Sequence, residues 1–109
     1  MFDLYIDSGK EILRNIREYK KIVARIKEIA LRHCENAEVY VFGSVLSGKV
    51  TASSDIDVLI IANLADESRT KLKADILREL GFPPVEIHVV SKEEFKRWYS
   101  KFIDKIERI

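Results

Sequence analysis

Two short apolar runs on either side of a polar, glycine-containing segment limit the fold of this chain more than any other feature. The first run is Val39 to Phe42, and the second, Val58 to Ala62, follows Asp57 directly. Apolar runs of this length between turn-forming residues are typical of strands. We therefore expect strands over residues 38–42 and 55–62. The second run is apolar on both faces, which is typical of a central strand covered on both sides.

The segment between the runs carries side chains suited to bind a phosphate and a cation. Gly43 has no Cβ, so the backbone there can approach a ligand closely. Ser44 can cap a short helix over residues 44–48, whose N-terminus would attract an anion. Asp55 and Asp57 are two residues apart, so on an extended chain both leave the same face, with Cα atoms about 6.6 Å apart. A phosphate site beside two carboxylates suits phosphoryl or nucleotidyl transfer, which depends on positioning and charge neutralisation.

A long amphipathic helix is expected before the first strand. Ser8 and Glu11 have the spacing of a capping box, and apolar residues then recur at steps of three and four to about residue 32. The stripe is formed by Ile12, Ile16, Tyr19, Val23, Ile26 and Ala30. A helix over residues 8–32 would be about 37 Å long, more than a small sheet requires. Its excess length is either an exposed end or a contact surface for a homodimer or another protein.

The rest of the chain continues the alternation of helices and strands. A helix is expected over residues 66–80 and a strand over residues 85–90. A last helix over residues 92–106 begins with a second capping box, at Ser91. The order of elements is then α-β-α-β-α-β-α, which predicts an α+β fold with a small mixed three-stranded sheet backed by helices.

Composition narrows the class of protein. The 109 residues suffice for one domain with a single core, so we expect residues 1–109 to form one unit. The net charge of +1 is too low for a generic nucleic-acid binder. The one cysteine, Cys34, cannot form an internal disulfide, which favours a cytoplasmic location. No apolar run is long enough to span a membrane.

The arrangement of Gly43-Ser44, ten further residues, and then Asp55-x-Asp57 on a strand resembles the signature of the DNA polymerase beta-like nucleotidyltransferases. The order of elements fits as well, so the resemblance covers most of the chain. Within that superfamily, the chain is similar to the minimal nucleotidyltransferases, small proteins often paired with a HEPN-domain partner in toxin–antitoxin systems. The resemblance implies Mg²⁺-dependent transfer of a nucleoside monophosphate from an NTP, with ATP expected, to a hydroxyl acceptor. The acceptor is expected on the HEPN partner.

The resemblance also assigns the metal ligands within a catalytic core over residues 38–90. Asp55 and Asp57 would hold two Mg²⁺ ions, and in the family a third carboxylate on the third strand completes the metal site. Glu86 stands on that strand here, where the family usually has aspartate. His88 is two residues further along the same face and is either an assisting base or a strand histidine without a role in the site.

Gly43 and Ser44 would hold the triphosphate. In the family, arginines commonly follow this pair, but residues 45–47 of this chain are Val-Leu-Ser, so Lys49 is the candidate for the missing positive charge. These departures leave a second hypothesis open. In that hypothesis the protein is a non-catalytic, antitoxin-like binding module that neutralises a HEPN partner by occlusion.

Overall fold

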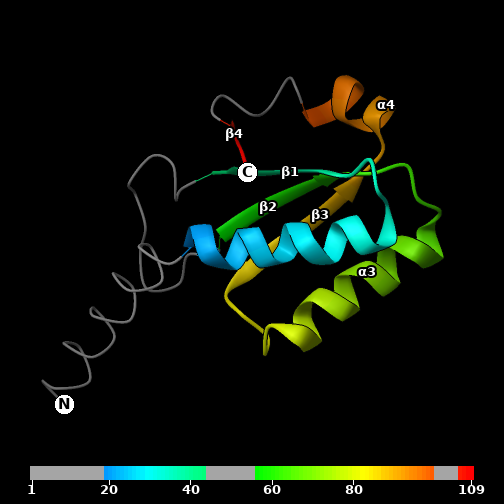
Figure 1. Cartoon of the computed structure of the whole chain (residues 1–109). Coiled ribbons are helices and arrows are strands. Elements are labelled where there is room, and N and C mark those ends of the chain that lie inside the picture. Colours follow the sequence, from blue (N-terminus) through cyan, green and yellow to red (C-terminus); the bar gives the residue numbers. More distant parts are fainter. Residues whose placement is uncertain (1–18, 44–55, 100–105) are drawn as a thin grey trace, which may run out of the picture.

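The computed structural model describes residues 19–43, 56–99 and 106–109. In chain order its elements are a helix over residues 19–33 (hereafter the N-terminal helix), β1 (Glu38–Phe42), β2 (Ile56–Ile61), α3 (Asp66–Glu79), β3 (Val85–Val90), α4 (Lys92–Glu94), a π-helical turn (Phe95–Tyr99) and β4 (Ile106–Arg108) (Figure 1). The predicted helix start at residue 8 and the predicted short helix over residues 44–48 lie outside the described residues. None of the described helices is both long and apolar enough to cross a membrane.

The four strands form one mixed sheet in the order β3-β2-β1-β4. β2 pairs antiparallel with β1, with Leu59 opposite Tyr40, and parallel with β3 on its other side. β4 pairs antiparallel with the outer edge of β1. The prediction of an α+β fold, with a mixed sheet whose central strand is the second apolar run, is confirmed.

β4 corrects two predictions. Within the described residues the sheet has four strands rather than three, and the last helix does not extend to residue 106, because Ile106 begins a strand. The apolar spacing after residue 91 fits a helix. Pairing of β4 with β1 is favoured instead, because it satisfies backbone hydrogen-bonding groups on an edge of β1 that would otherwise be open. The amide of Ile109 adds to this pairing by donating to the carbonyl oxygen of Val39 at 2.9 Å.

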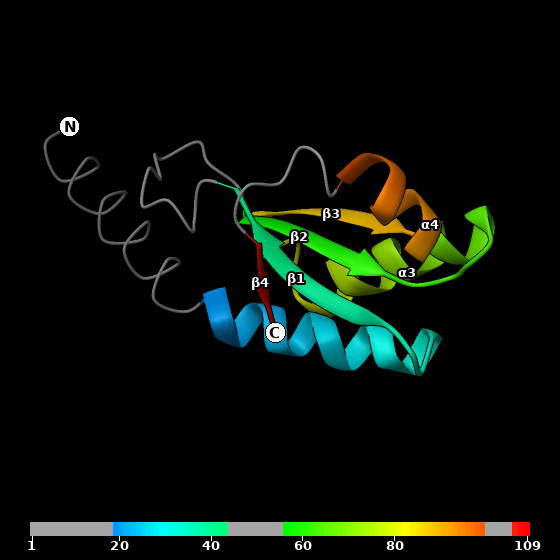
Figure 2. The same ribbon diagram turned by 90° about the horizontal axis from the view of Figure 1, so that it is seen from above.

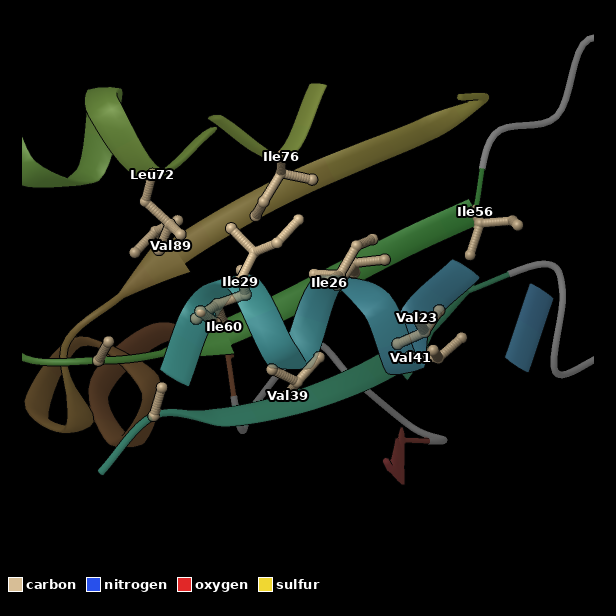
Figure 3. Packing of buried hydrophobic residues seen from close by; sticks show 14 residues of the cluster. Val23, Ile26, Ile29, Val39, Val41, Ile56, Ile60, Leu72, Ile76 and Val89 are labelled. Atoms are coloured by element: carbon tan, nitrogen blue, oxygen red, sulfur yellow. The ribbon is translucent and has the colours of Figure 1, made fainter. Parts of the chain in front are cut away.

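The N-terminal helix and α3 cover one face of the sheet (Figure 1). Two polar contacts join these helices: His33 Nε2 lies 2.9 Å from Asp75 Oδ2, and Arg32 donates to Glu79 Oε1 at 2.9 Å. Alternate residues of the strands point toward the helices and form most of the core. Its members include Val23, Ile26, Ile29, Val39, Val41, Ile56, Ile60, Leu72, Ile76 and Val89 (Figure 3).

The opposite face of the sheet is divided into an apolar end and a polar end. At the apolar end Leu59, Ile61 and Val90 are buried, and the ring of Phe95 stacks on that of Tyr40 with centroids 6.4 Å apart. α4 lies on this side of the sheet, over the C-terminal ends of β2 and β3 (Figure 2). The N-terminal ends of the same two strands carry charged residues on this face, which makes it the candidate functional face.

Arg69 of α3 holds the start of α4 against the sheet. Its guanidinium donates to Glu94 Oε1 at 2.6 Å and to the carbonyl oxygens of Leu64 and Val89 at 2.9 and 3.3 Å. Glu94 also closes the predicted capping box with Ser91, which is confirmed. Arg69 is only 21% exposed, because it lies in the first turns of α3, directly after the β2–α3 connection, where its side chain reaches over the C-terminal ends of the strands.

We expect the Arg69–Glu94 pair to make stability depend on acid pH. The hydrogen bond from Arg69, followed by that from the Ser91 amide, lowers the pKa of Glu94 from 4.5 to about 2. A lowered pKa in the folded state means that the stabilisation is complete above pH 4.5 and is lost as the pH falls toward 2. Glu94→Gln should therefore lower the free energy of unfolding by about 1 kcal/mol at pH 7, since the pair is partly exposed.

Melting temperatures of the wild type and of Glu94→Gln, measured between pH 2 and 7, test this expectation. The two curves should converge in acid. Glu93→Gln is the matched control, because Glu93 lies in the same turn and pairs with Arg97 while 76% exposed. It should change stability by less than about 0.5 kcal/mol. Parallel curves for wild type and Glu94→Gln at every pH would contradict the assignment.

Candidate functional site

Three polar side chains meet at the polar end of the open face: Asp57 on β2, with Glu86 and His88 on β3. The parallel pairing sets Asp57 directly opposite Glu86, and His88 points to the same side because side chains alternate along a strand. One donor atom from each residue lies within 4.8 Å of the other two. Glu86 and His88 follow Asp57 by 29 and 31 positions in the sequence, and the strand register brings them beside it.

The three side chains differ in how firmly they are held. His88 Nε2 lies 3.6 Å from Glu86 Oε1 and 4.0 Å from Asp57 Oδ1. Asp57 and His88 are 24% and 27% exposed, whereas Glu86 is 61% exposed and has more room to move. The ring of Phe42 packs against the His88 ring, with centroids 5.5 Å apart and planes inclined by 51°. Asp57 and His88 are thus largely fixed, and both remain accessible to a ligand.

Gly43 follows β1 and lies against the carboxylate of Asp57. Its φ of +85° is in the left-handed region, which side chains rarely adopt. A Cβ at this position would collide with Asp57 Oδ2 and lie 3.3 Å from Asp57 Cγ. The glycine is therefore required by the backbone conformation and by the position of the acid. The sequence predicts a close approach of Gly43 to a phosphate, but it contains no signal for this contact with Asp57.

The donor set suits a divalent cation. Two carboxylates held this close repel each other unless a positive charge lies between them. Carboxylate oxygens are the ligands of Mg²⁺, and an imidazole nitrogen extends the set to transition-metal ions. Asp57, Glu86 and His88 therefore have the chemistry and the mutual distances of a cation site, on a face that a substrate can reach.

The predicted site residues divide into two groups. Gly43, Asp57 and Glu86 are described and lie together, since Glu86 shares a face with Asp57 and Gly43 contacts Asp57. Ser44, Lys49 and Asp55 lie outside the described residues, so their places in the site stay predictions, as does the alignment of Glu86 with Asp55. The structure adds His88 as a donor beside the two acids. The sequence signal for this placement is that His88 follows Glu86 by two residues on a strand, which puts both side chains on one face.

The contact between Gly43 and Asp57 can be tested by exchanging each left-handed glycine for alanine. Gly43→Ala and Gly81→Ala should both lower the free energy of unfolding by about 1 kcal/mol, because φ is +85° and +68° at the two positions. Only Gly43→Ala should also weaken binding of a divalent cation, since its methyl group must displace the Asp57 carboxylate. Among the described residues, apart from its two chain neighbours, no heavy atom lies within 4 Å of a Cβ placed at Gly81.

Calorimetric titration of the three proteins with MnCl₂, alongside urea unfolding, separates the two effects. We expect at least a fivefold loss of cation affinity, about 1 kcal/mol, for Gly43→Ala and no loss for Gly81→Ala. Equal cation affinities in both variants would show that the close approach of Gly43 does not position Asp57.

Known proteins share both the sequence pattern and the fold of this chain. A sequence profile described as the nucleotidyltransferase domain matches residues 14–109, whereas no curated protein matches. A crystal structure provisionally described as a nucleotidyltransferase is 30% identical, with a TM-score of 0.68, over 84% of this chain and 98% of that one. Another, from Sulfolobus solfataricus and described in the same terms, shares the fold at 22% identity and a TM-score of 0.58, over 93% of this chain and 84% of that one. The chain belongs to the nucleotidyltransferase domain family.

Proposed function

We propose that this protein transfers a nucleoside monophosphate from an NTP, with ATP as the expected donor, to a hydroxyl group. The observation that carries the proposal is the meeting of Asp57 and Glu86 on an accessible face, beside the glycine turn that follows β1. Membership of the nucleotidyltransferase family makes nucleotidyl transfer the reaction class that this site fits best.

The proposed reaction exchanges one phosphorus–oxygen bond for another. The acceptor oxygen forms a bond to the α-phosphorus, the bond from that phosphorus to the bridging oxygen breaks, and pyrophosphate leaves. Asp55, Asp57 and Glu86 would hold Mg²⁺, with two ions expected from the resemblance to the family. When bound, the ions neutralise the phosphates and stabilise charge on the leaving group. Glu86 is the more exposed of the two described acids, and we assign its carboxylate as the acceptor of the hydroxyl proton.

The triphosphate would lie along the segment that begins at Gly43. Gly43 has a left-handed backbone conformation directly after β1 and lies beside the Asp57 carboxylate. Ser44 would donate to the phosphates and Lys49 would neutralise part of their charge. This arrangement places the phosphates next to the cation ligands, as nucleotidyl transfer requires.

The acceptor and the partner are proposed from the resemblance to the minimal nucleotidyltransferases. A HEPN-domain protein would provide the acceptor hydroxyl and form the other half of a toxin–antitoxin pair. The contact with it, or with a second copy of this chain, would involve the part of the predicted N-terminal helix before residue 19. The helix over residues 19–33 uses Val23, Ile26 and Ile29 for the core, so those side chains are not free for an interface.

Asp57→Asn tests the proposed reaction. The change keeps the side-chain volume and removes one of two neighbouring negative charges, so the free energy of unfolding should stay within about 1 kcal/mol of wild type. Transfer of labelled nucleotide from ATP should fall by at least about a thousandfold. The cation loses a main carboxylate ligand, and the phosphates then lose the positive charge that the cation supplies. The assay is labelling of the co-purified partner, run with a melting curve and a pull-down.

Asp66→Asn is the matched control, because Asp66 is an exposed aspartate at the start of α3, which covers the opposite face of the sheet. It should label the partner at the wild-type rate. Undiminished labelling by Asp57→Asn would contradict the proposed site. If the wild type binds its partner but labels nothing with ATP in the presence of either Mg²⁺ or Mn²⁺, the non-catalytic binding module is the correct description.

A further inference from the structure

We propose that His88 supplies a nitrogen ligand to the divalent cation held by Asp57 and Glu86. The site would then prefer a first-row transition-metal ion, such as Mn²⁺, over Mg²⁺. The inference rests on the proposed function in one respect: we take this cation to be the one that is used in nucleotidyl transfer. It concerns a residue outside the carboxylate set that the family resemblance implies.

The distances fit direct coordination after small side-chain movements. In an octahedral site with bonds of about 2.1 Å, neighbouring ligands lie about 3 Å apart and opposite ligands about 4.2 Å apart. His88 Nε2 is 3.6 Å from Glu86 Oε1 and 4.0 Å from Asp57 Oδ1, and all three donors lie within 4.8 Å of one another. Glu86 is 61% exposed, so its carboxylate has the freedom to make the adjustment.

The imidazole is held in position by the sheet. His88 is opposite Leu59, which is fully buried, so its backbone belongs to the firm central part of the β2–β3 pair. The Phe42 ring packs against it, and Phe42 is itself opposite Asp57 across the β1–β2 pair. A ligand fixed in this way loses little conformational entropy when it binds a cation.

A nitrogen ligand changes which cation is preferred. Mg²⁺ binds oxygen donors, requires near-ideal octahedral geometry and keeps several waters. Imidazole suits transition-metal ions, for which affinity at a mixed nitrogen and oxygen site exceeds that for Mg²⁺. Two carboxylates and one imidazole therefore favour first-row transition-metal ions over Mg²⁺ while leaving positions for the phosphates, and Mn²⁺, the weakest binder of that series, is the most stringent probe of the preference.

The chain has two histidines, which makes the test specific. Pulsed EPR of Mn²⁺ bound to tag-free protein shows the strong coupling of a directly bound nitrogen nucleus when an imidazole is coordinated, and that strong coupling is the readout here. The wild type and the control His33→Gln should show this nitrogen coupling, because His33 pairs with Asp75 between the helices on the far face. His88→Gln should lose the coupling and bind Mn²⁺ about tenfold more weakly, while Mg²⁺ affinity changes less than about twofold.

Nitrogen coupling that is absent from wild-type protein with Mn²⁺ bound would overturn the inference, as would coupling that persists in His88→Gln. The wild-type and His33→Gln spectra keep the test decisive even if His88→Gln does not fold. Mn²⁺ bound without nitrogen coupling, together with normal nucleotide transfer, would reject the His88 ligand and leave the proposed function standing. Failure of the wild type both to bind Mn²⁺ and to transfer nucleotide would overturn the inference and the proposed function together.

Discussion

The parallel pairing of β2 with β3 is the interaction on which the rest of the structure depends. Its register sets Asp57 opposite Glu86 and directs His88 to the same side. A shift of the register by one residue would turn one strand's side chains to the other face and separate the acids, because side chains alternate along a strand. Burial of both faces of β2 opposes such a shift, since Val58 and Ile60 fill the helix-covered core and Leu59 fills the opposite one. The core therefore fixes the geometry of the site.

The division of the sheet into two faces explains how one small chain has both a core and an accessible site. The N-terminal helix and α3 cover one face and bury most of its side chains, while α4 and Phe95 cover only the apolar end of the other. Arg69 links α3 to the start of α4 around the end of the strands, so the helical layer and the covered end of the open face are joined. Along β2 and β3, the polar residues of this face, Asp57, Glu86 and His88, lie at the end where a ligand can reach them.

Much of this arrangement could be predicted from the sequence, and the exceptions have identifiable causes. Local sequence patterns were enough to predict β3 and the Ser91 capping box, because the alternation of side chains along a strand and the capping of a helix both depend on residues a few positions apart. β4 was missed because pairing of Ile106–Arg108 with β1 is a long-range contact, whereas the local spacing favours a helix. The contact of Gly43 with Asp57 was also missed, because it depends on the turn of the backbone after β1. The pairing of Glu86 with Asp57 could be anticipated only through the family resemblance, which identifies the strand that carries a third carboxylate.

We infer that the carboxylates on the open face hold the cation used in nucleotidyl transfer. Anomalous diffraction from crystals grown with MnCl₂ and a non-hydrolysable ATP analogue would locate that cation. We expect an anomalous peak about 2.1–2.3 Å from oxygens of both Asp57 and Glu86, with the α-phosphate of the analogue against it. A peak that contacts neither acid, or nucleotide bound on the helix-covered side of the sheet, would show that these carboxylates do not hold the cation.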